Sequence, residues 1–105
     1  MADFMGLMKQ AAEFQSKMQD LQNELDRIEV EGTAGGGMVK VVATGAGEIK
    51  EIVIDPKAID PDDPELLADM VTAAVNEALR SSQSLLETKL GPALGGLHGL
   101  GLPGL

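Results

Sequence analysis

Few residues in this chain are of the types that carry covalent chemistry. Ser81, Ser82 and Ser84 lie close together, but a serine hydroxyl becomes a nucleophile only beside a base. The single histidine, His98, lies in a glycine-rich tail away from them. The chain has no cysteine, which excludes a disulfide framework, a thiol nucleophile and a thiolate metal site. The sequence therefore predicts a binding or structural protein and not an enzyme.

Carboxylates and glycines suggest two kinds of ligand site, and their surroundings argue against both. The acidic run at 60–65 lacks the spacing, central glycine and distal glutamate of a calcium-binding loop. Asp63 instead precedes Pro64 in the order that starts a helix. The glycine groups 35–37 and 45–47 lead into strand-forming residues, not into a helix whose amides could hold a phosphate. We therefore predict no metal, no cofactor and no small-molecule substrate.

The basic residues could contact a polyanion, but acidic residues outnumber them. The 105 residues include 8 Lys and Arg against 17 Asp and Glu, for a formal net charge of −9. DNA affinity comes mainly from cations that neutralise phosphates, and here the cations are scattered among acids. Phe4 and Phe14 are the only aromatic residues, so bases would find no stacking platform. Composition by itself favours a dimeric protein-interaction module over a DNA-binding protein.

Length and hydrophobic content predict one domain that benefits from a partner. The chain is 44% hydrophobic but only 2% aromatic, and a chain of this size buries only about 60–65% of its unfolded surface. A partner chain that covers more apolar surface is therefore favoured. The N-terminus lacks the basic region of a signal peptide, and no apolar run approaches the ~18 residues of a membrane span. We expect a soluble, cytoplasmic protein.

Apolar residues recur from residue 3 to 29 in a pattern that predicts a long N-terminal helix. Their spacing alternates between three and four residues, and this period keeps one seam of side chains facing a partner helix. The seam consists of Phe4, Leu7, Ala11, Phe14, Met18, Leu21, Leu25 and Ile28. Two interpretations remain open: the seam packs on the chain's own sheet, or it pairs with a helix of another chain.

Two runs rich in β-branched residues, 38–44 and 48–54, predict an antiparallel hairpin. They are separated by a short glycine-containing loop, as such hairpins require. In the second run, alternation predicts that Ile52 and Ile54 share a face with Lys50. The face of the first run predicted to pack on a helix consists of Val39, Val41 and Ala43.

A second long helix is predicted from Pro64 to about Leu90. Its buried face should comprise Leu67, Met70, Val71, Ala74, Ala78, Leu85 and Leu86. Gly91 and Pro92 should end the helix. We therefore assign residues 1–90 to a single domain and residues 91–105 to a flexible tail rich in glycine, leucine and proline.

Together these motifs resemble the YbaB/EbfC family of nucleoid-associated proteins. The resemblance covers essentially the whole chain in the same order. It rests on the segments 7–11 (LMKQA), 30–32 (VEG), 34–37 (AGGG), 54–56 (IDP) and 73–79 (AAVNEAL), followed by the tail.

The resemblance implies an α+β fold: a long N-terminal helix, a three-stranded antiparallel sheet whose first strand is 29–34, and a long C-terminal helix. It implies an interlocked homodimer shaped like tweezers, in the cytoplasm and associated with the nucleoid. Such a dimer binds double-stranded DNA with little sequence preference and influences nucleoid organisation and gene expression.

In this family, DNA contact is attributed to basic residues on the first and last helices. The residues at such positions here are Lys9, Lys17, Arg80 and Lys89. Family members commonly carry more lysine along these helices than this chain does. The alternative is therefore a protein-binding or scaffolding dimer that kept the fold and lost its affinity for DNA.

Overall fold

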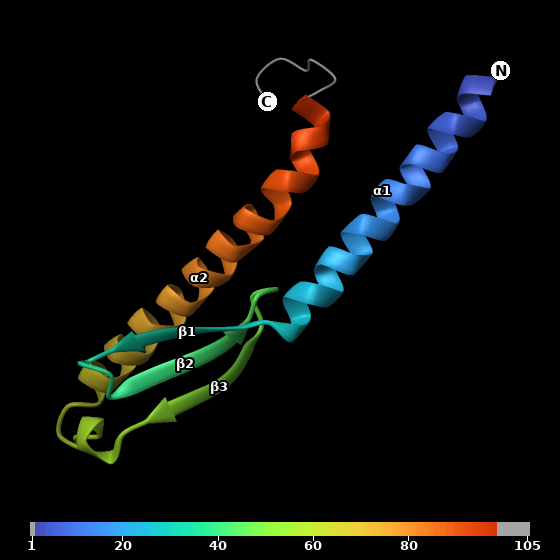
Figure 1. Ribbon diagram of the computed structural model, residues 1–105. Coiled ribbons are helices and arrows are strands. Elements are labelled where there is room, and N and C mark those ends of the chain that lie inside the picture. Colours follow the sequence, from blue (N-terminus) through green and yellow to red (C-terminus); the bar gives the residue numbers. More distant parts are fainter. Residues whose placement is uncertain (1, 99–105) are drawn as a thin grey trace.

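Two long helices and three strands make up the chain (Figure 1). The computed structural model describes residues 2–98, and the side chains of residues 3–92. The elements are α1 (Ala2–Arg27), β1 (Glu29–Ala34), β2 (Val39–Thr44), β3 (Ile49–Ile54), the short 3₁₀ helix η1 (Pro56–Ala58) and α2 (Pro64–His98). The strands form one antiparallel sheet in the order β1-β2-β3. The predicted α+β fold and its elements, including the strand at 29–34, are confirmed.

α2 packs against β1 and β2, and small residues allow a close approach. A Cβ atom on Gly32 of β1 would lie 2.2 Å from the backbone oxygen of Ala74 and 2.4 Å from the backbone nitrogen of Ala78. The core consists of Val39, Val41, Ala43, Ala58, Ala74 and Ala78. The predicted packing face of β2 is thus confirmed. On α2 the predicted buried face holds at its centre but not at Leu86, whose side chain is 38% exposed.

β3 contains a bulge next to its centre. Val42 of β2 lies opposite Glu51, but the next residue, Ala43, lies opposite Ile49. Lys50 is therefore an extra residue in β3 and breaks the alternation of side chains between the two faces. We call the face on which α2 packs the inner face of the sheet, and the opposite face the outer face.

The bulge turns Lys50 to the outer face. Val30 packs against the core, so its neighbour Glu29 points outward. Lys50 Nζ lies 2.7 Å from Glu29 Oε2, and this hydrogen bond raises the pKa of Lys50. The pair therefore stabilises the fold below the ordinary lysine pKa and is lost as pH rises through the raised value. The prediction that Lys50 shares a face with Ile52 was wrong, because alternation along a sequence does not reveal an extra residue.

Much of α1 lies away from the rest of the chain (Figure 1). The radius of gyration is 20.0 Å, against about 13 Å for a compact chain of this length. At the C-terminal end of α1, Leu25 is only 2% exposed, whereas Phe4 and Leu7 are both 64% exposed. The seam therefore packs on its own chain only near the sheet, and its N-terminal part is available to another chain.

α2 begins where predicted and ends later. At its start, the backbone N–H of Leu66 donates to Asp63 Oδ1 at 3.2 Å, as expected of a helix cap. The helix then continues through Pro92 to His98, so the predicted end near Leu90 was wrong. A proline removes a single backbone donor, and Leu90, Ala93 and Leu94 beside it favour helical backbone. Residues 99–105 of the predicted tail lie outside the described residues.

α1, β2 and α2 are joined at one end of the sheet. The buried Ser82 of α2 donates its hydroxyl to the backbone oxygen of Thr44 at 2.7 Å. The N–H of the next residue, Gly45, donates to the backbone oxygen of Ile28 at 2.8 Å. These bonds fix the C-terminal end of α1 and the middle of α2 to the same strand end, from which both helices extend beyond the sheet (Figure 1).

Candidate nucleic-acid interface

Lys9 and Lys17 lie on the exposed part of α1. Eight helical residues place them about 12 Å apart along the axis and roughly 80° apart around it. Both side chains are exposed, and neither forms an ion pair with a carboxylate of the described part of the chain. Glu13 lies four residues from each lysine and weakens the local positive potential. The two lysines can therefore contact an external anion, although the negative charge of Glu13 weakens that attraction.

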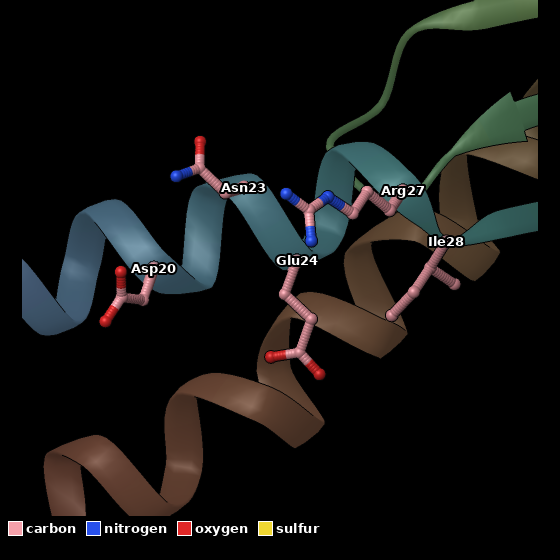
Figure 2. A pocket seen from close by; sticks show the side chains of 5 residues that line it. All are labelled: Asp20, Asn23, Glu24, Arg27 and Ile28. Carbon is pink, nitrogen blue, oxygen red and sulfur yellow. The ribbon is translucent and has the colours of Figure 1, made fainter.

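Lys89 is already paired within the chain. Its Nζ lies 2.7 Å from Oε1 of Glu24, and the side chains of Lys89 and Glu24 are 37% and 49% exposed. Figure 2 shows Glu24 directed from α1 toward α2. A pair this exposed contributes little to stability. It does, however, join the two long helices and offsets the charge that Lys89 would offer to a phosphate.

Arg80 points away from this pair. It is exposed and lies nine residues before Lys89 on α2, which places the two side chains roughly 180° apart around the helix. Within one chain, the structure thus brings Lys89 beside α1 and leaves Arg80 on the other side of α2. The role of these cations in DNA contact stays a prediction.

Arg27 is a further cation that we did not single out from the sequence. It lies 18 residues after Lys9, or about five turns of helix, and therefore on the same side of α1. Its side chain lines an open hollow of about 380 Å³ (Figure 2). The hollow is lined by Asp20, Asn23, Glu24, Arg27 and Ile28. The helical period of the sequence could have identified Arg27 as a companion of Lys9.

The described residues hold neither a cluster of metal ligands nor a helix that could cross a membrane. Among residues 3–92, whose side chains the structure describes, no three aspartate or glutamate side chains are grouped closely enough to hold a metal ion. The helices of residues 2–98 also lack a stretch that is both long and apolar enough to cross a membrane.

The chain has an α+β fold in which a small sheet carries two long helices with exposed cations. Such an arrangement is typical of a protein that binds a partner. Comparison with known families identifies it further. Residues 1–97 match the model of the YbaB/EbfC DNA-binding family. The chain belongs to this family, which is not a known family of enzymes.

Individual relatives are similar to this chain over nearly its whole length. A nucleoid-associated protein of Streptomyces avermitilis is 54% identical over 99 residues, covering 94% of this chain and 88% of the relative. One from Nitrobacter winogradskyi is 50% identical over 103 residues, covering 98% and 94%. The crystal structure of an uncharacterized protein from Helicobacter pylori matches with a TM-score of 0.73 and 22% identity, covering 90% of this chain and 96% of that one. This structural match supports the fold alone.

Proposed function

We propose that the protein binds duplex DNA as a homodimer with little sequence preference. It acts in the bacterial cytoplasm at the nucleoid, and influences nucleoid organisation and gene expression. The observation that carries this proposal is the match to a DNA-binding family over residues 1–97, with relatives named as nucleoid-associated proteins. No cofactor or small-molecule substrate takes part.

Exposed apolar side chains support the homodimer. Phe4, Leu7 and Met8 on α1 are 64%, 64% and 58% exposed, and Ile52 on β3 is 44% exposed. Burial of apolar surface stabilises an interface by roughly 25 cal/mol per Å² before the costs of association. A second copy would cover apolar surface that this chain leaves in water.

The cations supply phosphate contacts and not base readout. Lys9, Lys17 and Arg80 are exposed on long helices, where they can follow a phosphate backbone. Reading base edges requires a group of arginine, asparagine or glutamine side chains on an element that enters the groove. We find no such group in the sequence, so contacts to the backbone and the shape of the DNA should dominate. The local potential near these cations decides binding, whatever the net charge of −9.

Binding of the purified protein to a fluorescent duplex over a salt series tests the proposal. We expect the affinity to fall steeply with salt, by a factor of about 10³ or more between 50 and 200 mM if six or more phosphates are contacted. Duplexes of unrelated sequence should bind with similar affinity. The mass measured in the same buffer should be that of two chains.

The second candidate function is a protein-binding or scaffolding dimer. The net charge of −9 favours it, as do the ion pairs that occupy Lys40, Lys50 and Lys89. A dimer that does not bind DNA even at low salt would contradict the DNA-binding proposal and support this alternative. A monomeric mass would contradict both.

Substitution of Glu24 by glutamine should strengthen DNA binding. The change releases Lys89 from its partner 2.7 Å away and removes one negative charge from each chain. If the released lysine contacts phosphate in both chains, the salt dependence steepens by about two units of slope on a logarithmic plot. Fluorescence anisotropy with the same duplex at several salt concentrations measures both the affinity and the slope.

Glu13→Gln is the matched control for this substitution. It removes the same charge from α1, but Glu13 takes no part in the ion pairs recorded for the described residues. Glu13→Gln should raise the affinity as well, because it removes a carboxylate four residues from Lys9 and Lys17, but it should leave the slope unchanged. Equal slopes in Glu13→Gln and Glu24→Gln would mean that Lys89 gains no phosphate contact. A steeper slope in Glu24→Gln only is the signature of a released lysine.

A further inference from the structure

Within the described part of the chain, α1 is held only near its C-terminal end. Every side chain from Asp3 to Lys17 is exposed, Met18 and Leu21 are half-buried, and Leu25 is 2% exposed. The helix is therefore an arm that the rest of the chain supports at one end. The direction in which α1 leaves the sheet depends on the few residues that pack around Leu25.

Gly45, the residue after β2, lies where Leu25 of α1 and Leu85 of α2 come together. A Cβ atom on Gly45 would lie 2.8 Å from Leu85 Cδ2, 3.0 Å from the backbone oxygen of Leu25 and 3.2 Å from Leu25 Cδ2. All three separations are shorter than the ~3.5–4.0 Å of an ordinary non-bonded contact. We call Leu25, Gly45 and Leu85 the socket. A side chain at its centre would push α1 and α2 apart.

The backbone of Gly45 does not itself require glycine. Glycine is needed where φ is positive, and the glycines with positive φ are Gly35, Gly36, Gly37 and Gly47. Alanine at Gly45 would therefore act through the space that its methyl group takes and not through a strained φ. This position offers a way to move α1 with little effect on the conformation of the strand end.

Two other contacts join α1 to the chain nearby, and neither sets its direction firmly. The ion pair between Glu24 and Lys89 is exposed, and exposed pairs contribute little. The N–H of Gly45 donates to the backbone oxygen of Ile28, which lies after the end of α1. This bond fixes the point from which α1 departs and not its angle. Close packing around the buried Leu25 is therefore the main resistance to a tilt.

A small tilt at the socket becomes a large displacement at the lysines of α1. Lys17 and Lys9 precede Leu25 by 8 and 16 residues, or about 12 and 24 Å of helix. Each degree of tilt then moves Lys9 by about 0.4 Å, and a tilt of about 5° moves it by roughly 2 Å. A hydrogen bond to a phosphate oxygen spans only about 2.7–3.2 Å, so a displacement of this size can break it.

We propose that the socket sets the angle between α1 and α2, and thereby positions Lys9 and Lys17 for contact with duplex DNA. The socket residues are positioning residues, since they carry no charge and act through α1. The role in DNA contact rests on the proposed function, whereas the control of the angle does not. The two parts can therefore be tested separately.

The distance between spin labels on α1 and α2 measures the angle. The natural chain has no cysteine, so nitroxide labels attach only at Gln10→Cys and Asn76→Cys, two exposed positions outside the socket. Dilution with excess unlabelled natural protein leaves one labelled copy in each dimer. Gly45→Ala should shift the mean distance, measured by double electron–electron resonance, by about 2 Å or more.

Titration of an unlabelled Gly45→Ala protein with a fluorescent duplex measures the effect on DNA contact. If the tilt takes one lysine of each chain out of reach of phosphate, the affinity falls. The slope of the logarithmic salt dependence should then fall by about 1.8, because each lost contact contributes ~0.9.

Two further variants distinguish positioning from a general loss of structure. Gly45→Ala combined with Leu85→Ala removes the atom that lies 2.8 Å from the new methyl group, so the natural distance and affinity should return. Gly6→Ala adds the same methyl group to α1 where a Cβ meets nothing within 4 Å, and should change neither quantity. Circular dichroism establishes that each variant is folded.

Leu25→Ala tests the socket from the side of α1, and it replaces Gly45→Ala if that variant does not fold. The substitution removes the side chain that packs at the base of the arm. We expect a broader distribution of distances between the labels, since α1 loses the packing that holds its direction.

The possible results separate the two parts of the inference. An unchanged distance in folded Gly45→Ala, or a distribution in Leu25→Ala as narrow as that of the natural chain, would overturn the control of the angle. A shifted distance with unchanged affinity and slope would overturn the positioning role and leave the proposed function standing. A natural chain that does not bind the duplex would contradict the proposed function, and the distances would still decide whether the socket sets the angle.

Discussion

Replacement of Gly32 by alanine should lower the free energy of unfolding by about 2–4 kcal/mol. The added Cβ would lie 2.2 Å from the backbone oxygen of Ala74 and 2.4 Å from the backbone nitrogen of Ala78. Both contacts are with backbone atoms, so no rotation of a side chain can relieve them. α2 would have to move away from β1, and the packing of Val39 and Val41 beneath it would loosen.

Urea denaturation followed by circular dichroism measures this effect. Gly6→Ala is the matched control, because a Cβ on Gly6 meets nothing within 4 Å. The same chemical change in the exposed helix α1 should stabilise the protein by about 0.5–1 kcal/mol. All variants must be compared at one protein concentration, since a dimer's stability depends on it. Equal midpoints for Gly32→Ala and the natural chain would contradict the close approach of α2 to β1.

Loss of Lys9 and Lys17 together should weaken DNA binding by about 100-fold or more at low salt. In a homodimer the double alanine variant removes four exposed cations. If each neutralises one phosphate, the slope of the logarithmic salt dependence falls by about 3.6, because each contact contributes ~0.9. Titration of a fluorescent duplex at four or more salt concentrations gives both values for this variant and the natural protein.

A second double variant separates specific contacts from net charge. Lys40→Ala with Lys50→Ala removes the same number of cations from the outer face of the sheet, where both lysines pair with glutamates. We expect a much smaller loss of affinity from this change. Comparable losses in the two double variants would show that total charge governs binding, and would contradict a role for α1 in contacting DNA.

The elements of the fold could be predicted because their signals lie close together in the chain. The apolar period of residues 3–29 and the β-branched runs each act over a few residues. The cap at Asp63 was likewise visible as a local motif, and its hydrogen bond to Leu66 confirms it. Glycine and proline were less reliable signals, since α2 continues through Pro92 at the cost of one backbone donor.

Contacts between distant parts of the chain could not be predicted in this way. Nothing near Gly32 in the sequence shows that α2 crosses it. Nothing near Lys89 shows that its partner is Glu24, 65 residues away. The hydroxyl of Ser82 was considered for chemistry, and the structure instead uses it to bond the end of β2.

Residue types and local spacing were enough to predict the order of helices and strands, the family, and which residues are available as cations. Those properties depend on residue type and on spacing within a few turns or strand residues. Which cations are paired within the described chain follows from the folded arrangement instead. Lys89 is paired because packing brings α1 beside α2, and Lys50 faces outward because of a bulge between two strands. Coulomb interactions and backbone pairing act through space, so they are settled only when distant segments meet.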